Sequence, residues 1–150
     1  MTEFKLISEI ISKSLSDTWE DAKKEWVLSN IYFAESPETC LCGHFPIIEL
    51  CELKNNKNGN NATVGNCCVK KFIGLSSDKI FQAVKRIRND SGKSLNAETL
   101  ELALDNNWIN SWEFDFYTDT LRKRKLTEKQ MQKRNQINEK IILKVNQHNK

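Results

Sequence analysis

The sequence lacks cysteine everywhere except between Cys40 and Cys68, a short stretch that holds all five cysteines of the 150 residues. It has only two histidines, His44 and His148. No apolar run approaches the ~20 residues that a membrane-spanning helix needs, so we expect no membrane partner. The zinc-protease motif His-Glu-x-x-His is absent, and so is the deaminase combination of His-x-Glu with Cys-x-x-Cys. These absences argue against a catalytic metal and predict neither catalytic residues nor enzyme activity.

The concentration of cysteines indicates one local site, because cysteines used as core filler would be scattered along the chain. Disulfides could use four of the five thiols. However, the sequence opens with Met-Thr-Glu-Phe-Lys and shows no signal peptide, and an odd cysteine count fits a reducing compartment better. We therefore expect a cytoplasmic protein whose thiols bind a metal.

The spacing within this stretch predicts a structural Zn²⁺ site. Cys40-x-Cys42-Gly43-His44 has the form of a tight turn, in which Gly43 adopts a positive φ and brings thiolates around one ion. Structural zinc takes four nitrogen or sulfur ligands in a tetrahedron. The expected metal ligands are Cys40, Cys42, His44 and Cys68.

Two further cysteines compete for this site. Cys67 and Cys68 are neighbours, and adjacent side chains at a helix start point about 100° apart, so one ion normally takes only one of them. Cys51 lies in the middle of an expected strand and is the alternative ligand to His44 if the hairpin folds back over the turn. The choice between His44 and Cys51 stays open.

The residues between the cysteines predict a β-hairpin followed by a helix. Residues 46–53 read as a strand and residues 62–64 as its return, joined by an Asn-rich turn in which Asn58-Gly59 is the strongest hairpin signal. A helix then opens at Cys68, where the helix dipole favours a thiolate. A cysteine turn, a hairpin and a helix start with a cysteine follow one another in the order of a treble-clef-like zinc site.

The length of the chain suits one domain. The apolar periodicity predicts a mainly helical α+β protein, with helices over 3–15, 17–31, 78–88, 97–105 and from Thr127 to about residue 145. The expected segments are N-terminal helices over 1–35, a zinc-binding hairpin and helix over 38–74, a helical region over 77–120, and a basic C-terminal helix over 121–150.

Positive charge is concentrated at the end of the chain. Residues 121–150 contain 10 Lys and Arg against 2 acidic residues, whereas residues 1–120 contain 13 against 18. A basic tail on an acidic body suggests a polyanion partner. The expected nucleic-acid contacts are Lys70, Lys71, Arg122, Lys123, Arg124 and Lys125. The long final helix is also an available dimer surface.

Residues 106–120 carry the densest aromatic cluster, including Trp108 and Trp112. Aromatic residues interleaved with cations can stack on unpaired bases, but the charges interleaved here are acidic: Glu113, Asp115 and Asp119. This pattern favours core packing or a protein-binding surface.

Three segments carry a resemblance to a known group. They are Glu25-Trp26, then Cys40-x-Cys42-Gly43-His44 with Val64-Gly65-Asn66-x-Cys68-Val69-x-x-Phe72, and last Arg122-Lys123-x-x-Leu126-Thr127-x-Lys129-Gln130. Through them the chain resembles small zinc-binding proteins encoded by bacteriophages and other bacterial mobile elements. The resemblance implies a zinc-binding module with helical flanks, implies that Cys68 and not Cys67 is the ligand, and implies no particular activity.

Three functions are compatible with these features. The first is a non-enzymatic nucleic-acid-binding accessory protein in which zinc is a structural staple. The second is a phage-encoded inhibitor that binds a host or defence protein through residues 108–119. A ββα-metal nuclease is the weakest, because its histidine base ends a strand, whereas His44 precedes the hairpin and His148 lies in a tail.

Overall fold

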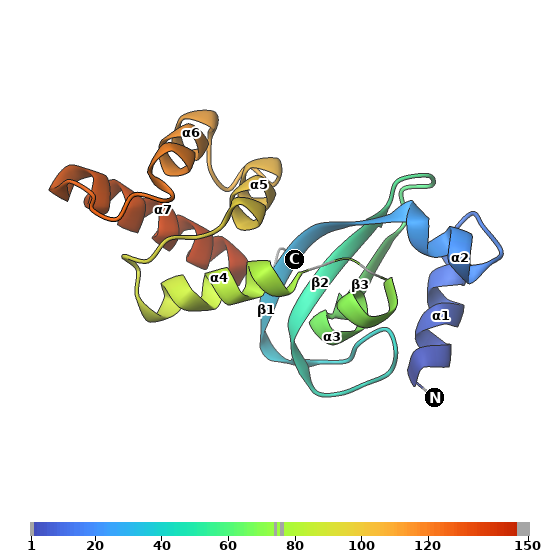
Figure 1. The fold of residues 1–150 in the computed structure, drawn as a ribbon. Helices are drawn as coiled ribbons and strands as arrows, with labels where there is room; N and C mark the ends of the chain where they lie inside the picture. The colour runs from blue at the N-terminus through green and yellow to red at the C-terminus, as the bar shows by residue number, and fades with distance from the viewer. Residues whose placement is uncertain (1, 74, 76, 147–150) are drawn as a thin grey trace. The chain divides into compact units, whose positions relative to one another are not determined.

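The computed structural model describes residues 2–73, 75 and 77–146 of the chain. The chain divides into two compact units, residues 1–78, called here the sheet unit, and residues 79–150, called the helical unit. Within the described residues there are seven α-helices and one three-stranded antiparallel sheet, which confirms the expected α+β class (Figure 1). A single domain over residues 1–150 stays a prediction.

The sheet unit begins with helix α1 (Thr2–Ser12), a short helix α2 (Trp19–Ala22) and a 3₁₀ turn η1 (Lys23–Glu25). Leu6 and Ile10 of α1 lie one helical turn apart and are both fully buried. The helical unit also begins with a helix, so an N-terminal helix is common to both units.

Strand β1 (Trp26–Glu38) corrects the prediction of helix over 17–31 and of N-terminal helices over 1–35. Helical structure ends at Glu25, and the following residues are β-branched and aromatic, types that suit a strand packed on one face. β1 pairs with strand β2 along most of its length, with Ile31 opposite Cys51. The apolar spacing that suggested a helix was overridden by this pairing, which local sequence does not report.

Strands β2 (Ile47–Asn55) and β3 (Asn61–Gly65) form the predicted hairpin, and the sheet order is β1-β2-β3 with all pairs antiparallel. The turn between them is held by Asn55, whose Oδ1 accepts from the N–H groups of Lys57 and Asn58 at 2.7 and 3.2 Å. Gly59 has φ +78°, a conformation that glycine adopts without strain. The hairpin turn predicted at Asn58-Gly59 is therefore confirmed.

A buried carboxylate ties the start of the sheet to the segment after α1. Glu25 Oε1 accepts from Leu15 N–H at 2.9 Å and from Asn55 Nδ2 at 2.8 Å, and Oε2 accepts from Ser16 N–H at 2.9 Å. Hydrogen bonds from the side chains of Ser16 and Asn55 and from Leu15 N–H lower the pKa of Glu25 to about 2. The ionised form is therefore the one that this part of the fold requires.

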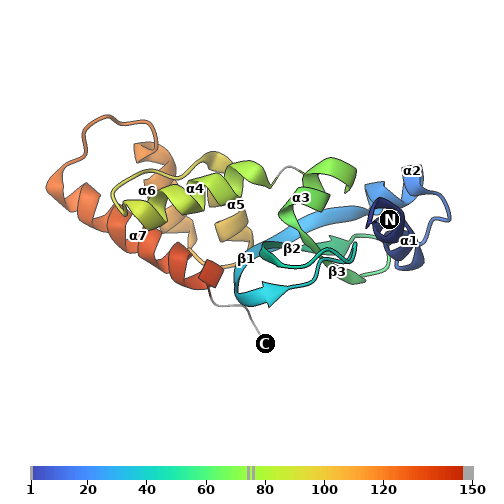
Figure 2. The same cartoon turned by 90° about the horizontal axis from the view of Figure 1, so that it is seen from below.

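The chain leaves β3 through a short helix α3 (Asn66–Cys68) and continues as a π-helical turn η2 (Val69–Ile73). The helix expected to open at Cys68 thus begins two residues earlier and widens after one turn. Both ribbon views place α3 against the sheet and α1 beside β3 (Figures 1 and 2).

The helices of the helical unit are α4 (Asp78–Asn89), whose first residue still belongs to the sheet unit, α5 (Ala97–Asp105), α6 (Ser111–Thr120) and α7 (Glu128–Asn146). The predicted cap of α5 is confirmed, because Asn96 Oδ1 accepts from Thr99 N–H at 3.0 Å. The predicted capping box of α7 is also present, with reciprocal bonds between Thr127 and Gln130 at 3.0 and 3.1 Å. None of the helices that the structure describes is both long and apolar enough to cross a membrane.

A polar network around two buried side chains, Tyr117 and Asn138, joins elements of the helical unit. The Tyr117 hydroxyl accepts from Leu95 N–H at 3.0 Å and donates to Asn138 Oδ1 at 2.7 Å. Asn138 Nδ2 donates to the carbonyls of Ser91 and Lys93 at 2.7 and 2.8 Å. Tyr117 and Asn138 are both 0% exposed, and through their side chains the network joins α6, α7 and the 91–95 loop.

Candidate metal centre

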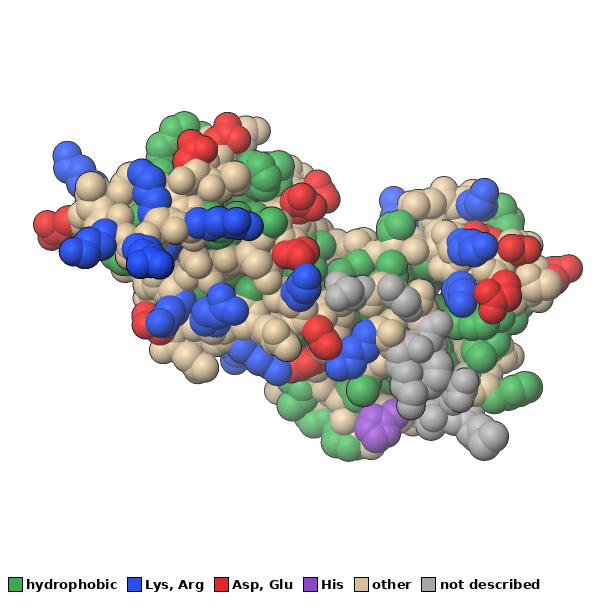
Figure 3. Space-filling view, viewed as in Figure 1, with side chains coloured by type: hydrophobic (Ala, Val, Ile, Leu, Met, Phe, Trp, Pro, Cys, Tyr) green, Lys and Arg blue, Asp and Glu red, His purple; other side chains and the backbone are tan. Residues whose placement is uncertain are grey.

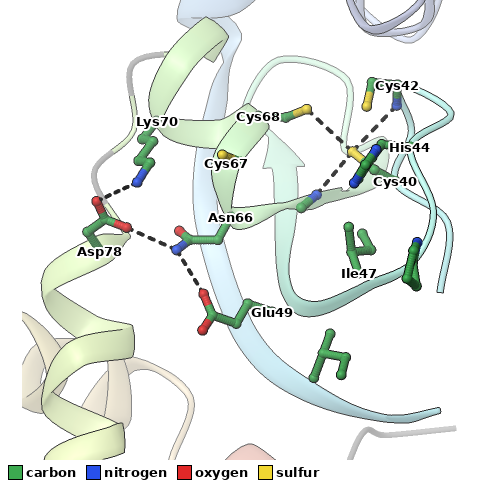
Figure 4. A pocket seen from close by; sticks show the side chains of 13 residues that line it. Cys40, Cys42, His44, Ile47, Glu49, Asn66, Cys67, Cys68, Lys70 and Asp78 are labelled. Atoms are coloured by element: carbon green, nitrogen blue, oxygen red, sulfur yellow. Dashed lines mark hydrogen bonds and ion pairs between the residues drawn. The ribbon is translucent and has the colours of Figure 1, made fainter. Parts of the chain in front are cut away.

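Three buried cysteines form the most distinctive cluster of the sheet unit. The Sγ atoms of Cys40, Cys42 and Cys68 all lie within 4.8 Å of one another, and Cys40 and Cys68 are 3.5 Å apart (Figure 4). The residues are 3%, 3% and 9% exposed. We call these three residues the cysteine cluster; its members come from two segments 28 residues apart in the chain.

The turn that carries two of them is closed by backbone hydrogen bonds. Gly43 N–H donates to the Cys40 carbonyl at 2.8 Å, and Cys40 N–H donates to the His44 carbonyl at 2.9 Å. Gly43 has φ +94°, so the expected need for glycine at this position is confirmed. Cys68 is the last residue of α3, which begins directly after β3.

The cluster is built to hold negative charge on Cys40. Cys40 Sγ and Cys68 Sγ share a hydrogen bond at 3.5 Å, and Cys40 Sγ also accepts from Gly65 N–H at 3.2 Å and from Cys42 N–H at 3.5 Å. The Cys68 hydrogen bond, followed by these backbone donors, lowers the pKa of Cys40 to about 5, whereas the same bond and burial raise the pKa of Cys68. These hydrogen bonds therefore favour the thiolate form of Cys40.

The donor set fits a thiophilic divalent ion. Sulfurs bound to one tetrahedral zinc ion at about 2.3 Å lie about 3.8 Å apart, so sulfurs already within 4.8 Å need only a small shift to bind it. The three cysteines would bind such an ion as thiolates, so metal binding would release their thiol protons. The cysteine cluster could thus hold a metal ion.

A cavity of about 720 Å³ opens over the cluster. Its walls come entirely from the sheet unit. They combine the three cluster cysteines with apolar and charged side chains: Pro46, Ile47, Ile48, His44, Glu49, Asn66, Cys67, Lys70 and Asp78. A site with three ligands beneath an open cavity differs from a closed structural site, in which the protein surrounds the ion.

Asn66 connects two carboxylates at the wall of this cavity. Its Nδ2 donates to Glu49 at 3.2 Å and to Asp78 at 3.0 Å, and its Oδ1 accepts a short hydrogen bond from the Ser77 hydroxyl (Figure 4). Lys70 pairs with Asp78 at 2.9 Å. Sequence reasoning missed this network, because its members come from β2, α3 and the start of α4 and share no spacing pattern.

The remaining candidate ligands lie outside the cluster. His44 is exposed on the cavity wall, and its ring nitrogens are not part of the group of mutually close ligand atoms. Cys51 is fully buried on β2, 3.5 Å from the Ser77 hydroxyl, and burial raises its pKa to about 12. Cys67 is exposed. Zinc as the metal and His44 as the fourth ligand stay predictions.

The residues expected to contact nucleic acid differ in their surroundings. Arg122, Lys123, Arg124 and Lys125, called here the basic loop, lie between α6 and α7 and are all exposed. Many Lys and Arg side chains are visible on the face of the helical unit drawn in Figure 3. Lys70 is instead engaged by Asp78. The side chain of Lys71 lies outside the described part of the structure.

Comparison of the chain with protein-family models, with curated proteins and with solved structures found no match.

Proposed function

We propose that the protein is a zinc-stapled, non-enzymatic nucleic-acid-binding accessory protein of a phage or other mobile element. The metal is Zn²⁺, held by Cys40, Cys42 and Cys68 in a treble-clef-like arrangement of turn, hairpin and helix start. Zinc suits this role because it binds thiolates without redox chemistry. The ion contributes to folding, and nucleic acid is contacted elsewhere on the chain.

The basic loop carries the nucleic-acid part of the proposal. Four consecutive cations are all exposed, and none of their side chains pairs with a carboxylate among the described residues. Consecutive cations repel one another, so a loop of this kind gains most from a polyanion that neutralises several of them at once. Lys70 contributes less, since its ion pair with Asp78 would have to be broken first.

The aromatic surface of α6 supports the same partner. Trp112 is 59% exposed and stacks on Phe116 with ring centroids 5.5 Å apart. Lys133 of α7 lies 5.1 Å from the centre of the Trp112 ring. A flat exposed ring beside a cation is the combination on which unpaired bases stack.

A protein-binding inhibitor is the second candidate, and one observation favours it. The exposed face of α6 that carries Trp112 also carries exposed Asp115 and Asp119. Acidic neighbours disfavour a phosphate backbone and suit a basic protein surface. The aromatic region is only partly buried, since Trp108 and Tyr117 are in the core whereas Trp112 is not.

The test is fluorescence anisotropy with labelled single- and double-stranded DNA and RNA at two salt concentrations. Each phosphate contact to a duplex contributes about 0.9 to the log–log salt slope, or about 0.7 for a single strand. Replacing all four residues of the basic loop by alanine should therefore weaken binding strongly and flatten the salt dependence.

The matched control removes four other exposed cations, Lys24, Lys54, Lys57 and Lys93. This variant changes the net charge by the same amount and should retain most of the affinity and the salt slope. Equal losses of affinity in the two variants would show that binding depends on net charge alone and not on the basic loop. Absence of binding by the wild-type protein at low salt would reject the nucleic-acid proposal and leave the inhibitor.

A further inference from the structure

The cysteine cluster supplies three ligands, and a zinc-like ion normally takes four. The fourth position therefore has to be filled by another group of this chain or by a molecule from outside. His44 is the nearest candidate by sequence, but its side chain is exposed and stands apart from the three sulfurs.

We propose that the fourth coordination position is open to the cavity and accepts an uncharged nitrogen donor, such as an imidazole, that does not belong to this chain. The inference rests on the metal binding proposed above and is independent of nucleic-acid binding.

The shape of the site is the first argument. All three cluster cysteines line the cavity of about 720 Å³, so a metal bound to them would be reached directly from it. A single water takes up about 30 Å³, and the cavity therefore has room for an organic ligand. The absence of a side chain at Gly65 keeps this approach free, because a Cβ there would lie 3.3 Å from Ile47 Cδ1 and 3.8 Å from Cys40 Sγ.

The charge of the site selects the kind of ligand. A divalent ion bound to three thiolates carries a net charge of −1, because all three cysteines bind in the deprotonated form. Glu49 and Asp78 add two negative charges to the wall, and the single cation, Lys70, is already paired with Asp78. Anionic ligands are repelled by this surplus of negative charge, whereas an uncharged donor is not.

The apolar part of the wall fits the body of such a ligand. Pro46, Ile47 and Ile48 line the cavity, and Ile48 is 50% exposed. A heteroaromatic ring can bind the metal through nitrogen while its carbon edge lies against these side chains. The carboxylates of Glu49 and Asp78, which Asn66 holds in place on the same cavity wall, are available to accept a hydrogen bond from the ring N–H.

The experiment uses the full-length protein loaded with Co²⁺, whose visible spectrum reports both the thiolate ligands and the coordination geometry. The wild-type protein and His44→Ala are each titrated with imidazole, with azide and with a short histidine-containing peptide. We expect saturable shifts of the d–d bands with imidazole or with the peptide in both proteins, and no shift with azide at the same concentrations. The peptide and the free ring distinguish a protein side chain from a small molecule as the source, and binding of either supports the proposal.

A closed site gives a different pattern. If His44 is the fourth ligand, the wild-type spectrum will not respond to imidazole, and only His44→Ala will take it up, which would overturn the proposal. Equal shifts with azide and imidazole would overturn the charge argument. If no thiolate-to-cobalt charge-transfer band forms at all, the metal site itself fails, and this result is distinguishable from a metal-loaded protein that ignores added ligands.

Discussion

The sheet unit and the helical unit each contain a distinctive cluster of buried polar side chains, and the two clusters differ in what satisfies them. In the helical unit, the interior groups of Tyr117 and Asn138 satisfy one another and nearby backbone carbonyls. In the sheet unit, the hydrogen bond with Cys68 and two backbone N–H donors lower the pKa of Cys40 to about 5. The Tyr117–Asn138 network is thus satisfied by atoms of its own unit, whereas the cysteine cluster could hold a metal ion that comes from outside the chain.

Removal of the metal should have the largest effect on stability, and this effect should be confined to the sheet unit. We expect Cys68→Ser, or a strong chelator, to release the ion and to accelerate amide hydrogen exchange across the hairpin and α3, because metal-binding free energy is part of the folding free energy there. Exchange in α4 to α7 should change little. Metal content by elemental analysis and peptide-resolved hydrogen exchange measure both effects.

Cys67→Ser is the matched control, since it makes the same substitution at the adjacent position. Cys67 is exposed and lies outside the cluster, so this variant should bind one metal ion and exchange like the wild-type protein. Loss of metal in Cys67→Ser with retention in Cys68→Ser would reverse the assignment of the ligand.

Asn138→Ala should destabilise the helical unit and leave metal binding by the sheet unit unchanged. The substitution leaves the buried Tyr117 hydroxyl without its acceptor and the part-buried carbonyls of Ser91 and Lys93 without their donor, and we expect a loss of about 2 kcal/mol in the free energy of unfolding of this unit. Chemical denaturation followed by hydrogen exchange provides the measurement.

Asn135→Ala is the control on the same helix. Its buried Oδ1 has no hydrogen-bond partner among the described residues, so its removal should cost far less. Comparable destabilisation by the two substitutions would show that lost packing, and not the polar network, determines the result.

Glu25→Gln gives a smaller effect that depends on pH and is confined to the sheet unit. The folded pKa of Glu25 is lowered from 4.5 to about 2, so its carboxylate stabilises the fold fully above pH 4.5 and loses this contribution as the pH falls towards 2. The stability difference between wild type and Glu25→Gln should therefore be present at pH 7 and shrink across that window.

Unfolding midpoints measured from pH 7 to pH 2 test this expectation. Glu35→Gln, at an exposed position of β1, should follow the wild-type curve throughout. A difference between wild type and Glu25→Gln that stays constant with pH would assign the effect to packing of the side chain and not to its charge.

Short-range chemistry made much of this fold predictable. The positive φ of Gly43 and Gly59, the Asn96 cap and the Thr127–Gln130 capping box all depend on residues within a few positions of one another, and the structure contains each of them. Helix α6 lies inside the helical region predicted over 77–120, but the prediction gave it no bounds of its own, although the Asn110–Glu113 capping box marks its start.

The wrong prediction for β1 and the missed Asn66 network share a physical cause. The apolar spacing in the first part of β1 is compatible with a helix as well as with a strand. Hydrogen bonds to β2, some 20 residues away in the chain, favour the strand. The Asn66 network could not be foreseen either, because its carboxylates approach each other only when β2 and the start of α4 are placed beside α3.

The sequence by itself determined that candidate metal ligands lie between Cys40 and Cys68, where several turns and helix caps fall, and which end of the chain is basic, since these properties depend on composition and on neighbouring residues. Only the tertiary structure decided that Cys40, Cys42 and Cys68 meet while Cys51 and Cys67 do not, and that the site opens into a cavity. Ligand geometry around an ion is a matter of distances of a few ångströms between segments that are far apart in the chain, and those distances are set by how the hairpin packs against α3.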